Sequence, residues 1–271
     1  MKPFIKYCGG KTALLPEILP RIPAKIGTYY EPFLGGGAVF FALADEDRFE
    51  RAVLADTNEE LMRTYAALCR YPNEVVLALK KHVYEERYYY KVRARDPKAL
   101  DAVACAARFL YLNRTGFNGL YRVNRKGEFN VPFGKYTNPT ICDEQRLRDA
   151  SAALKRTTAL AKTDFDKTVA DAKRGDFVYF DPPYAPVSAT ANFTAYSKEG
   201  FDGEAQWRLK NTAKHLIADG VNVLLSNSDT PLVRELYKGF HIERVSAPRR
   251  INSNGAKRGN VGELLISGKT K

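Results

Sequence analysis

Apolar and polar residues follow two different periods along the first part of the chain. Short apolar runs are typical of buried strands, and apolar residues at helical spacing are typical of helices. These patterns predict a strand over 28–33, a helix over 38–43 and a strand over 51–55. Because parallel strands need crossover helices, the alternation favours a mostly parallel α/β sheet with helices on both faces.

The same alternation returns after residue 156. The predicted elements are, in order, a strand at 157–162, a strand at 177–180, a helix at 206–218, a strand at 221–225, a helix at 231–237 and two strands at 241–245 and 263–266. We predict that the last two strands pair as a closing hairpin.

The middle of the chain has a different pattern. Helical spacing covers 61–79 and 100–112, and residues 113–136 are rich in Gly, Asn, Arg and aromatic residues, which predicts turns and short hairpins. We interpret this part as an insertion between the second and third strands. The predicted organisation is a sheet domain of residues 1–58 and 143–271 with an inserted, mainly helical and hairpin domain of residues 59–142.

Composition narrows the classes of protein. The chain has 271 residues, of which 45% are hydrophobic and 12% aromatic, so general disorder is excluded. The longest apolar run, 38–44, is far shorter than the ~18 residues of a membrane span. The start at Met1 leads into no apolar signal region, so we expect a cytoplasmic protein. Neither the four cysteines nor the three histidines show metal-ligand spacing, so we expect no metal site.

The positive charge is concentrated in two segments. The formal net charge is +12, and residues 87–135 carry a net +8 while residues 244–271 carry a net +6. Such segments on a near-neutral body favour a surface that faces phosphates, although two solvated basic loops explain the charge equally well. Aromatic residues interleave with the first segment, and this combination favours nucleic acid.

A glycine triplet follows the first predicted strand. Gly35 to Gly37 would let backbone approach a ligand closely, and Asp56 ends the next strand about 20 residues later. An acid at that spacing typically binds ribose hydroxyls. The triplet lacks the full pattern for a pyrophosphate, so a nucleoside cofactor without phosphates fits better. By itself, the triplet is also consistent with a plain tight turn.

The sequence Asp181-Pro182-Pro183-Tyr184 ends a strongly apolar predicted strand. Open α/β sheets bind ligands at this carboxyl edge. The Asp181 carboxylate and the Pro182 carbonyl offer two acceptors in a stiff turn, and Tyr184 offers a flat ring. This set suits a planar amine with two N–H donors. The alternative is an ordinary Pro-Pro turn.

These motifs give the chain a strong resemblance to the Dam-type DNA adenine-N6 methyltransferases. Residues 6–11 (KYCGGK) are similar to the amino-terminal cofactor block of that family, residues 33–37 to its F-x-G-x-G block and residues 181–184 to its DPPY block. Residues 118–124 with 127–136 resemble its target-recognition hairpin, and residues 188–194 resemble the loop that follows DPPY. The blocks also stand in the same order.

The resemblance implies a fold, a cofactor and a reaction. The fold would be a Rossmann-like methyltransferase sheet, and the enzyme would transfer a methyl group from S-adenosylmethionine to N6 of adenine within GATC in duplex DNA, after flipping the base out. The implied cofactor-binding residues are Tyr7, Lys11, Phe33, Gly35, Asp56 and Asp181. Asp181, Pro182 and Tyr184 would form the catalytic group. No covalent nucleophile is needed.

The resemblance also implies contacts with DNA. The residues expected to contact bases, or to lie among those that do, are Asn118, Leu120, Arg122, Asn124, Tyr136 and Ser188. Arg122 is our first choice as a guanine reader, and its alternative role is a phosphate clamp. We expect Arg93, Arg95 and Lys135 to contact phosphates. Tyr7 (Trp in many relatives), Phe117 (often Tyr) and Tyr121 depart from the family pattern.

Two other functions remain open from the sequence. The same chemistry could act on cytosine N4, an RNA adenine or a protein glutamine, although related enzymes for cytosine and glutamine often begin the tetrad with Ser or Asn. The chain could also be a DNA-binding module that has lost catalysis. We expect a monomer, associated with the nucleoid, that binds double-stranded DNA and neither membrane nor metal.

Overall fold

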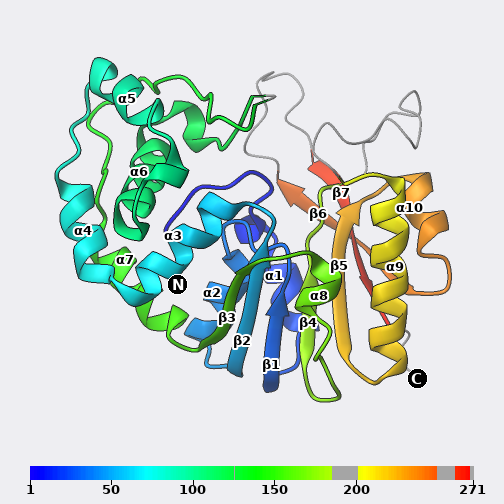
Figure 1. Cartoon of the computed structure of the whole chain (residues 1–271). Helices are drawn as coiled ribbons and strands as arrows, with labels where there is room; N and C mark the ends of the chain where they lie inside the picture. Colours follow the sequence, from blue (N-terminus) through cyan, green and yellow to red (C-terminus); the bar gives the residue numbers. More distant parts are fainter. Residues whose placement is uncertain (125, 185–200, 249–259, 269–271) are drawn as a thin grey trace. The chain divides into compact units, whose positions relative to one another are not determined.

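The structure is a computed structural model that describes residues 1–124, 126–184, 201–248 and 260–268 (Figure 1). The described residues include a seven-stranded sheet with the strand order β3-β2-β1-β4-β5-β7-β6. The strands are β1 (Ile26–Glu31), β2 (Phe49–Asp56), β3 (Thr157–Lys162), β4 (Phe177–Phe180), β5 (Asn222–Ser228), β6 (His241–Pro248) and β7 (Asn260–Ser267). The fold is therefore the predicted Rossmann-like α/β class.

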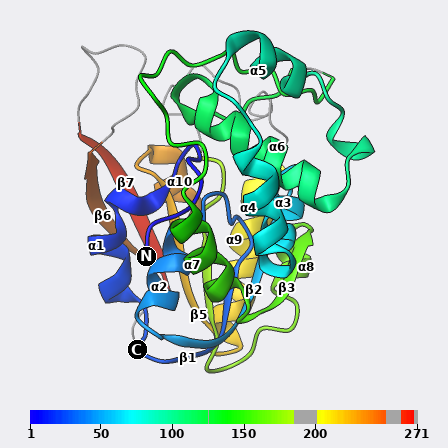
Figure 2. The same cartoon turned by 90° about the vertical axis from the view of Figure 1, so that its left-hand side faces the viewer.

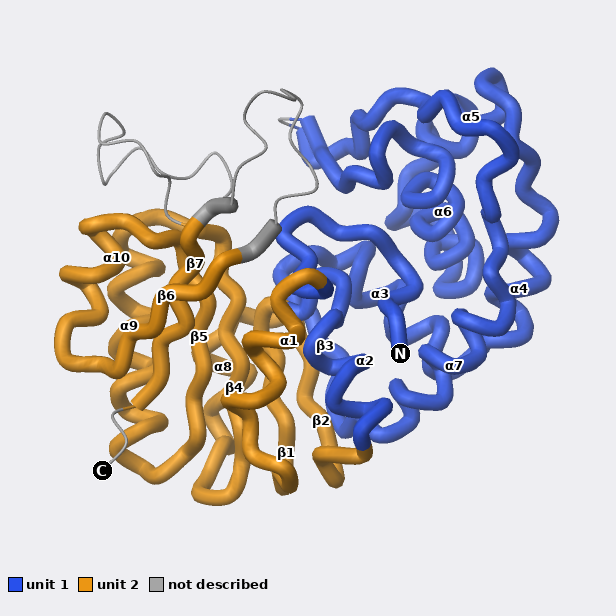
Figure 3. The backbone as a smooth tube through the Cα atoms, turned by 180° about the vertical axis from the view of Figure 1, so that it is seen from behind, with its two compact units in different colours: residues 1–12, 34–46, 56–162 blue, residues 13–33, 47–55, 163–271 orange. Residues whose placement is uncertain are grey.

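The chain divides into two compact units (Figure 3). Unit 1 comprises residues 1–12, 34–46 and 56–162, and unit 2 comprises residues 13–33, 47–55 and 163–271. The helices of unit 1 are α2 (Ala38–Asp45), α3 (Glu59–Arg70), α4 (Pro72–Lys80), α5 (Glu86–Arg93), α6 (Ala102–Thr115) and α7 (Glu144–Leu154). Those of unit 2 are α1 (Leu15–Ile18), α8 (Phe165–Thr168), α9 (Gly203–Ala218) and α10 (Pro231–Leu236). The predicted functional division into 1–58 with 143–271 and 59–142 stays a prediction.

Unit 2 is built around the parallel strands β1, β4 and β5. Within it, β1 also pairs in parallel with β2, and β5 pairs in antiparallel register with β7, which pairs with β6. All four residues of β4 are buried, as expected for a central strand covered on both faces. In the register, Phe180 lies opposite Leu225, and Glu263 lies opposite Ser228 at the end of β5. The polar ends of these strands therefore reach the carboxyl edge of the sheet.

Alternate side chains fill the two faces of this sheet. On one face Val178 and Phe180 of β4 join a core with Leu209 and Ala213 of α9, which lies along β5 in Figure 1. On the other face the Tyr29 ring is fully buried and stacks on Phe177, with ring centroids 6.3 Å apart. Because both faces exclude water, the strand ends are fixed on a rigid platform.

Unit 1 is organised around α6, which packs against α3, α4 and α5 (Figure 2). The Arg108 guanidinium of α6 forms a buried ion pair with Glu60 of α3. It also donates to the carbonyls of Val92 and Arg93, at 3.2 and 2.8 Å, which belong to the last turn of α5. One buried cation thus joins three helices. Burial nevertheless raises the pKa of Glu60, against the opposing effect of Arg108.

Two predictions about the middle of the chain need correction. The predicted helix over 61–79 is wrong as a single element, because α3 ends at Arg70 and α4 begins at Pro72. Tyr71 between them has non-helical backbone, with φ −132° and ψ 51°, since the residue before a proline disfavours helical backbone. In addition, the sequence pattern did not predict the helices α5 and α7. Charged and tyrosine residues dominate α5, so its apolar stripe is too narrow to be seen in the sequence.

The other predicted elements are confirmed with shifted ends. Strands β3 and β4 match their predicted ranges, and β6 and β7 form the predicted hairpin. In the described part of the chain, no helix combines the length and the apolar character needed to cross a membrane.

We predict that Arg108→Met destabilises the protein strongly, by about 3–5 kcal/mol in the free energy of unfolding, because Glu60 would be left buried without its cation. Chemical denaturation measures this change. Arg148→Met is the matched control, since Arg148 pairs with Glu144 on the surface of α7. A loss in the control as large as that in Arg108→Met would contradict the argument.

Candidate active site

The tetrad Asp181 to Tyr184 lies directly after β4, at the carboxyl edge of the sheet in unit 2. Asp181 and Tyr184 are half-buried, Pro182 is buried and Pro183 is exposed. The chain changes here from a fully buried strand to polar side chains within one residue. The prediction that this motif follows β4 at the sheet edge is therefore confirmed, while the catalytic roles of its residues stay predictions.

The Tyr184 hydroxyl is anchored by Glu263 of β7. It donates a hydrogen bond to Glu263 Oε2 over 2.6 Å. Burial raises the pKa of Tyr184 well above its usual value, and the nearby carboxylates of Asp181 and Glu263 raise it further. The phenol therefore stays protonated and donating through the physiological range.

Pro183 is anchored from the other side by two buried amides. Gln206 of α9 donates from Nε2 to the Pro183 carbonyl over 3.1 Å, and Asn227 of β5 donates from Nδ2 to Gln206 Oε1 over 3.3 Å. Both amide side chains are buried. The last two residues of the tetrad are thus held by side chains from α9, β5 and β7.

Gln206, Asn227 and Glu263 were not predicted as site residues. The sequence does carry a weak signal for two of them, since Asn227 lies next to the last residue of the apolar strand β5 and Glu263 directly precedes the apolar residues of β7. Buried polar groups of this kind need partners, and here they find them in the tetrad or in its support.

Phe33, the residue that begins the F-x-G-x-G block, lies in unit 2 among other rings. Its ring centroid is 5.6 Å from that of Phe165, 6.3 Å from Phe180 and 5.5 Å from Phe201. These contacts are those of a core residue at the sheet edge. The predicted contact of Phe33 with a cofactor stays a prediction.

In unit 1 the glycine loop is tied to Asp56. The Gly35 amide donates to Asp56 Oδ2 and the Asn58 amide donates to Asp56 Oδ1, each over 2.9 Å. Burial raises the pKa of Asp56, while these backbone N–H groups favour its ionised form. The carboxylate thus holds the glycine loop through Oδ2 and the backbone before α3 through Oδ1, and each oxygen keeps a further lone pair as an acceptor.

Tyr7 lies against the same loop. A Cβ atom on Gly35, whose φ is +46°, would stand 3.0 Å from Tyr7 Cδ1. Asn58 Nδ2 donates to the Tyr7 hydroxyl over 3.2 Å, and the Tyr7 ring stacks on Tyr121 with centroids 6.2 Å apart. Lys11 is buried in unit 1 and donates from Nζ to the Gly9 carbonyl over 2.7 Å. Unit 1 therefore brings the predicted cofactor residues Tyr7, Gly35 and Asp56 together.

The end of α6 holds the amino-terminal block in place. Asn113 accepts from the Lys6 amide at Oδ1 over 2.9 Å and donates from Nδ2 to the Lys6 carbonyl over 2.7 Å. The same amide group donates to the Gly119 carbonyl over 3.2 Å, and Arg114 donates to the Phe4 carbonyl over 2.7 Å. One side chain thus connects the predicted cofactor block with the predicted recognition segment. Nothing in the sequence pattern had singled out Asn113.

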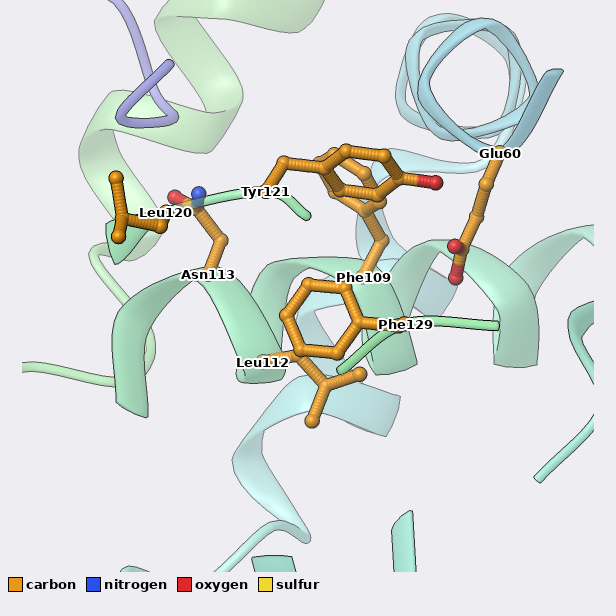
Figure 4. Close-up of a pocket in the computed structure, with 7 residues that line it drawn as sticks. All are labelled: Glu60, Phe109, Leu112, Asn113, Leu120, Tyr121 and Phe129. Carbon is orange, nitrogen blue, oxygen red and sulfur yellow. The ribbon is translucent and has the colours of Figure 1, made fainter. Parts of the chain in front are cut away.

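A small apolar pocket fixes the start of the recognition segment on unit 1 (Figure 4). It is lined by Glu60, Phe109, Leu112, Asn113, Leu120, Tyr121 and Phe129. The rings of Phe109, Tyr121 and Phe129 pack together, and the pocket has no room for a water molecule. The Tyr121 hydroxyl points toward Glu60, and burial raises the pKa of Tyr121 to about 12. We interpret this pocket as packing that supports the segment.

The residues that follow form a short hairpin with an exposed tip. Val123 and Phe129 bridge in antiparallel fashion, and Asn124 Oδ1 accepts from the amides of Lys126 and Glu128 over 2.9 and 3.0 Å. Asn124 is therefore a turn-forming residue. Arg122 is exposed and donates from Nε to Asn130 Oδ1 over 2.7 Å, which orients its guanidinium.

Of the other residues predicted to contact DNA, some have exposed side chains and some already donate hydrogen bonds to backbone carbonyls of the protein. Asn118, at φ +54°, is exposed, and so are Arg95 and Lys135. Tyr136 donates to the Gly116 carbonyl over 2.9 Å, and Arg93 donates to the Val131 carbonyl over 3.1 Å. Tyr136 and Arg93 thus support the recognition segment through these hydrogen bonds, which leaves fewer of their donors for DNA.

Ser188 and residues 249–259 of the second basic segment lie outside the described residues. Among the described residues, no group of three or more His, Cys, Asp or Glu side chains is arranged to hold a metal ion.

Comparisons with known proteins give the chain its family. The model of the D12 class N6 adenine-specific DNA methyltransferases matches residues 7–251. The Type II methyltransferase M1.LlaDCHI of Lactococcus lactis subsp. cremoris is 42% identical, over 98% of this chain and 95% of that protein.

Two further relatives show the same extent of likeness. The Type II methyltransferase M.MjaIII of Methanocaldococcus jannaschii is 40% identical, over 98% of both chains. The DNA adenine methylase of Escherichia coli K12 is 40% identical, over 97% of this chain and 93% of that protein. The chain therefore belongs to the D12 class of N6 adenine-specific DNA methyltransferases.

Proposed function

We propose that the chain transfers a methyl group from S-adenosylmethionine to N6 of adenine within GATC in double-stranded DNA. The observation that carries the proposal is the anchored Asp-Pro-Pro-Tyr tetrad at the carboxyl end of β4. The enzyme class itself, a site-specific adenine DNA methyltransferase, follows from the family.

The predicted cofactor residues of unit 1 fit S-adenosylmethionine. Asp56 supplies a braced carboxylate for ribose hydroxyls, Tyr7 supplies a flat face, and the glycine loop lets backbone approach closely. The loop lacks the pattern that binds a pyrophosphate, which suits a nucleoside without phosphates. The cofactor supplies an electrophilic methyl on a sulfonium, and these side chains orient it.

The tetrad fits a planar amine. The N6 lone pair of adenine is delocalised into the ring, so the nitrogen is a weak nucleophile. The Asp181 carboxylate and the Pro182 carbonyl can each accept one N6–H hydrogen bond, which draws the nitrogen toward tetrahedral geometry and aims its lone pair. Catalysis then depends mainly on positioning, and no covalent intermediate with the protein is required.

The target base must leave the duplex before it can reach these acceptors. Flipping the base out of the duplex costs a few kcal/mol of free energy, and stacking it on an aromatic ring recovers on the order of 1–3 kcal/mol. Tyr184 offers a ring for this purpose. Its hydroxyl already donates to Glu263, so we assign the ring face to the base.

The hairpin tip supports recognition of duplex DNA. Arg122 is exposed and oriented by Asn130, and bidentate guanidinium contacts are the commonest readers of guanine. Exposed Lys135 and Arg95 suit phosphate contacts within a segment of net charge +8. We propose that the enzyme acts as a monomer on nucleoid DNA in the cytoplasm.

The proposal is tested by transfer of labelled methyl groups to duplexes with and without GATC. We expect label only in the GATC duplex and on N6 of adenine, and we expect Asp181→Ala to reduce the rate by roughly 100-fold or more, because one fixed acceptor is lost. Binding of DNA should be largely retained. Equal labelling of both duplexes would remove the GATC assignment, and full activity of Asp181→Ala would remove the role of Asp181.

Gly35→Ala tests the contact between the F-x-G-x-G block and Tyr7 in the predicted cofactor site of unit 1. The added methyl would meet the Tyr7 ring in a left-handed backbone, so we expect weaker binding of S-adenosylmethionine and a lower thermal midpoint. Gly127→Ala is the matched control, because its φ is also positive, +79°, but no atom lies within 4 Å of its added Cβ. Equal effects of the two substitutions on cofactor affinity, measured by calorimetry, would contradict the role of the Tyr7 contact.

Arg122→Ala tests recognition. We expect discrimination at one guanine to relax by about 1–3 kcal/mol, measured as the ratio of kcat/KM for GATC and singly substituted duplexes. Lys135→Ala should instead weaken binding to all duplexes alike and reduce its dependence on salt. If Arg122→Ala behaves as Lys135→Ala does, then Arg122 is a phosphate contact.

A further inference from the structure

Glu263 is a carboxylate brought to the tetrad by the carboxyl-terminal hairpin. It lies on β7, opposite Ser228 at the end of β5 and opposite Val245 of β6. Its backbone position is therefore fixed by two neighbouring strands. Its side chain is half-buried and accepts a hydrogen bond from the Tyr184 hydroxyl over 2.6 Å.

This hydrogen bond uses the only proton that the Tyr184 side chain can donate. Because the phenol is held protonated by burial and by two nearby carboxylates, it neither ionises nor offers a second donor to a substrate. What Tyr184 can present to a ligand is its ring face. The hydrogen bond from this hydroxyl to Glu263 restrains the plane of the ring.

The ring is fixed at both ends. The Pro183 carbonyl, immediately before Tyr184, accepts from Gln206, which is in turn oriented by Asn227. At the far end, Glu263 holds the hydroxyl. With its backbone and its hydroxyl both restrained, the Tyr184 ring loses most of its freedom to turn.

We propose that Glu263 is a positioning residue, which holds the Tyr184 ring in the plane on which the extruded adenine stacks. This proposal rests on the proposed function and deepens it. The competing role for the same carboxylate is direct: it would offset the positive charge that develops on N6, or take the proton that N6 loses. The two roles make opposite predictions for the transfer rate of Glu263→Gln, which keeps a neutral hydrogen-bond acceptor. They also differ in the effect expected of Glu263→Ala when Tyr184 has already been replaced by Phe.

A double-substitution cycle separates these roles. The variants are Glu263→Ala, Glu263→Gln, Tyr184→Phe and the double variant Glu263→Ala with Tyr184→Phe. Single-turnover rates, KM values and the fluorescence of 2-aminopurine in place of the target adenine are measured on a GATC duplex. The 2-aminopurine signal reports stacking, because an extruded base is brighter when no ring quenches it.

We expect Glu263→Ala and Tyr184→Phe each to lower the transfer rate on the order of 10-fold, the size of one hydrogen bond to a charged group. The double variant should be no slower than either, because both substitutions remove the same bond. Glu263→Gln should recover most of the rate, since its amide oxygen still accepts. The brightness of 2-aminopurine should rise in Glu263→Ala and Tyr184→Phe, with little change in KM for either substrate.

Other outcomes overturn the proposal. Losses that multiply in the double variant, or a Glu263→Gln variant as slow as Glu263→Ala, would assign Glu263 a direct electrostatic or proton-accepting role. Rates and 2-aminopurine brightness equal to those of the unmodified enzyme would leave it no role in the site. If Glu263→Ala does not fold, Glu263→Gln and Tyr184→Phe still decide between the two roles, since each removes little volume.

Glu243→Gln is the matched control. Glu243 is a carboxylate on β6 of the same hairpin. It forms an ion pair with Arg21, at an N···O distance of 2.6 Å, and not with the tetrad. Loss of its charge should therefore not alter the rate of methyl transfer. Failure of the unmodified enzyme to methylate the GATC duplex would reject the proposed function. An active unmodified enzyme with multiplying losses would reject only the role of Glu263.

Discussion

The constraint on which the site in unit 2 depends is the abrupt end of a buried strand. β4 is buried on both faces, and the next residue is a carboxylate. Two consecutive prolines remove two backbone donors at this point, so the turn cannot be held by its own N–H groups. The protein holds it instead through side chains, with Gln206 on the Pro183 carbonyl and Glu263 on the Tyr184 hydroxyl. The rigidity that positioning catalysis needs therefore comes from α9 and β7 as well as from the fixed φ angles of the two prolines.

In unit 1 the side-chain amide of Asn113 has a comparable supporting role. Among the described residues the amino-terminal block pairs with no strand, and Asn113 bonds both backbone groups of Lys6. Because the same side chain also donates to Gly119, the block and the recognition segment share one support at the end of α6. The buried pair of Arg108 and Glu60 fixes that helix against α3 and α5. A substitution at either place would disturb both predicted ligand surfaces of the unit together.

Much of the fold followed from periodicity, because strands such as β4 are short, apolar and bounded by clear turn residues. The break between α3 and α4 was missed, although Pro72 was visible, because the apolar spacing continues across it. The positions of the tetrad and of the Gly35–Asp56 contact were also predictable, since sheet topology brings strand ends to one edge. The supports at Asn113, Gln206 and Glu263 were not. Each is a long-range contact of a polar side chain, and local sequence carries no record of its partner.

Two departures from the family pattern turn out to be neighbours. The sequence resemblance had marked Tyr7 and Tyr121 as departures from the expected pattern, and in unit 1 their rings stack at 22° with centroids 6.2 Å apart. The Tyr121 ring also packs on Phe109 and Phe129. The two rings therefore form one packing contact between the predicted cofactor block and the recognition segment. Phe117 is different, since its ring is 49% exposed. Of the three departures, Phe117 is thus the one placed to alter what the protein contacts rather than how it is packed.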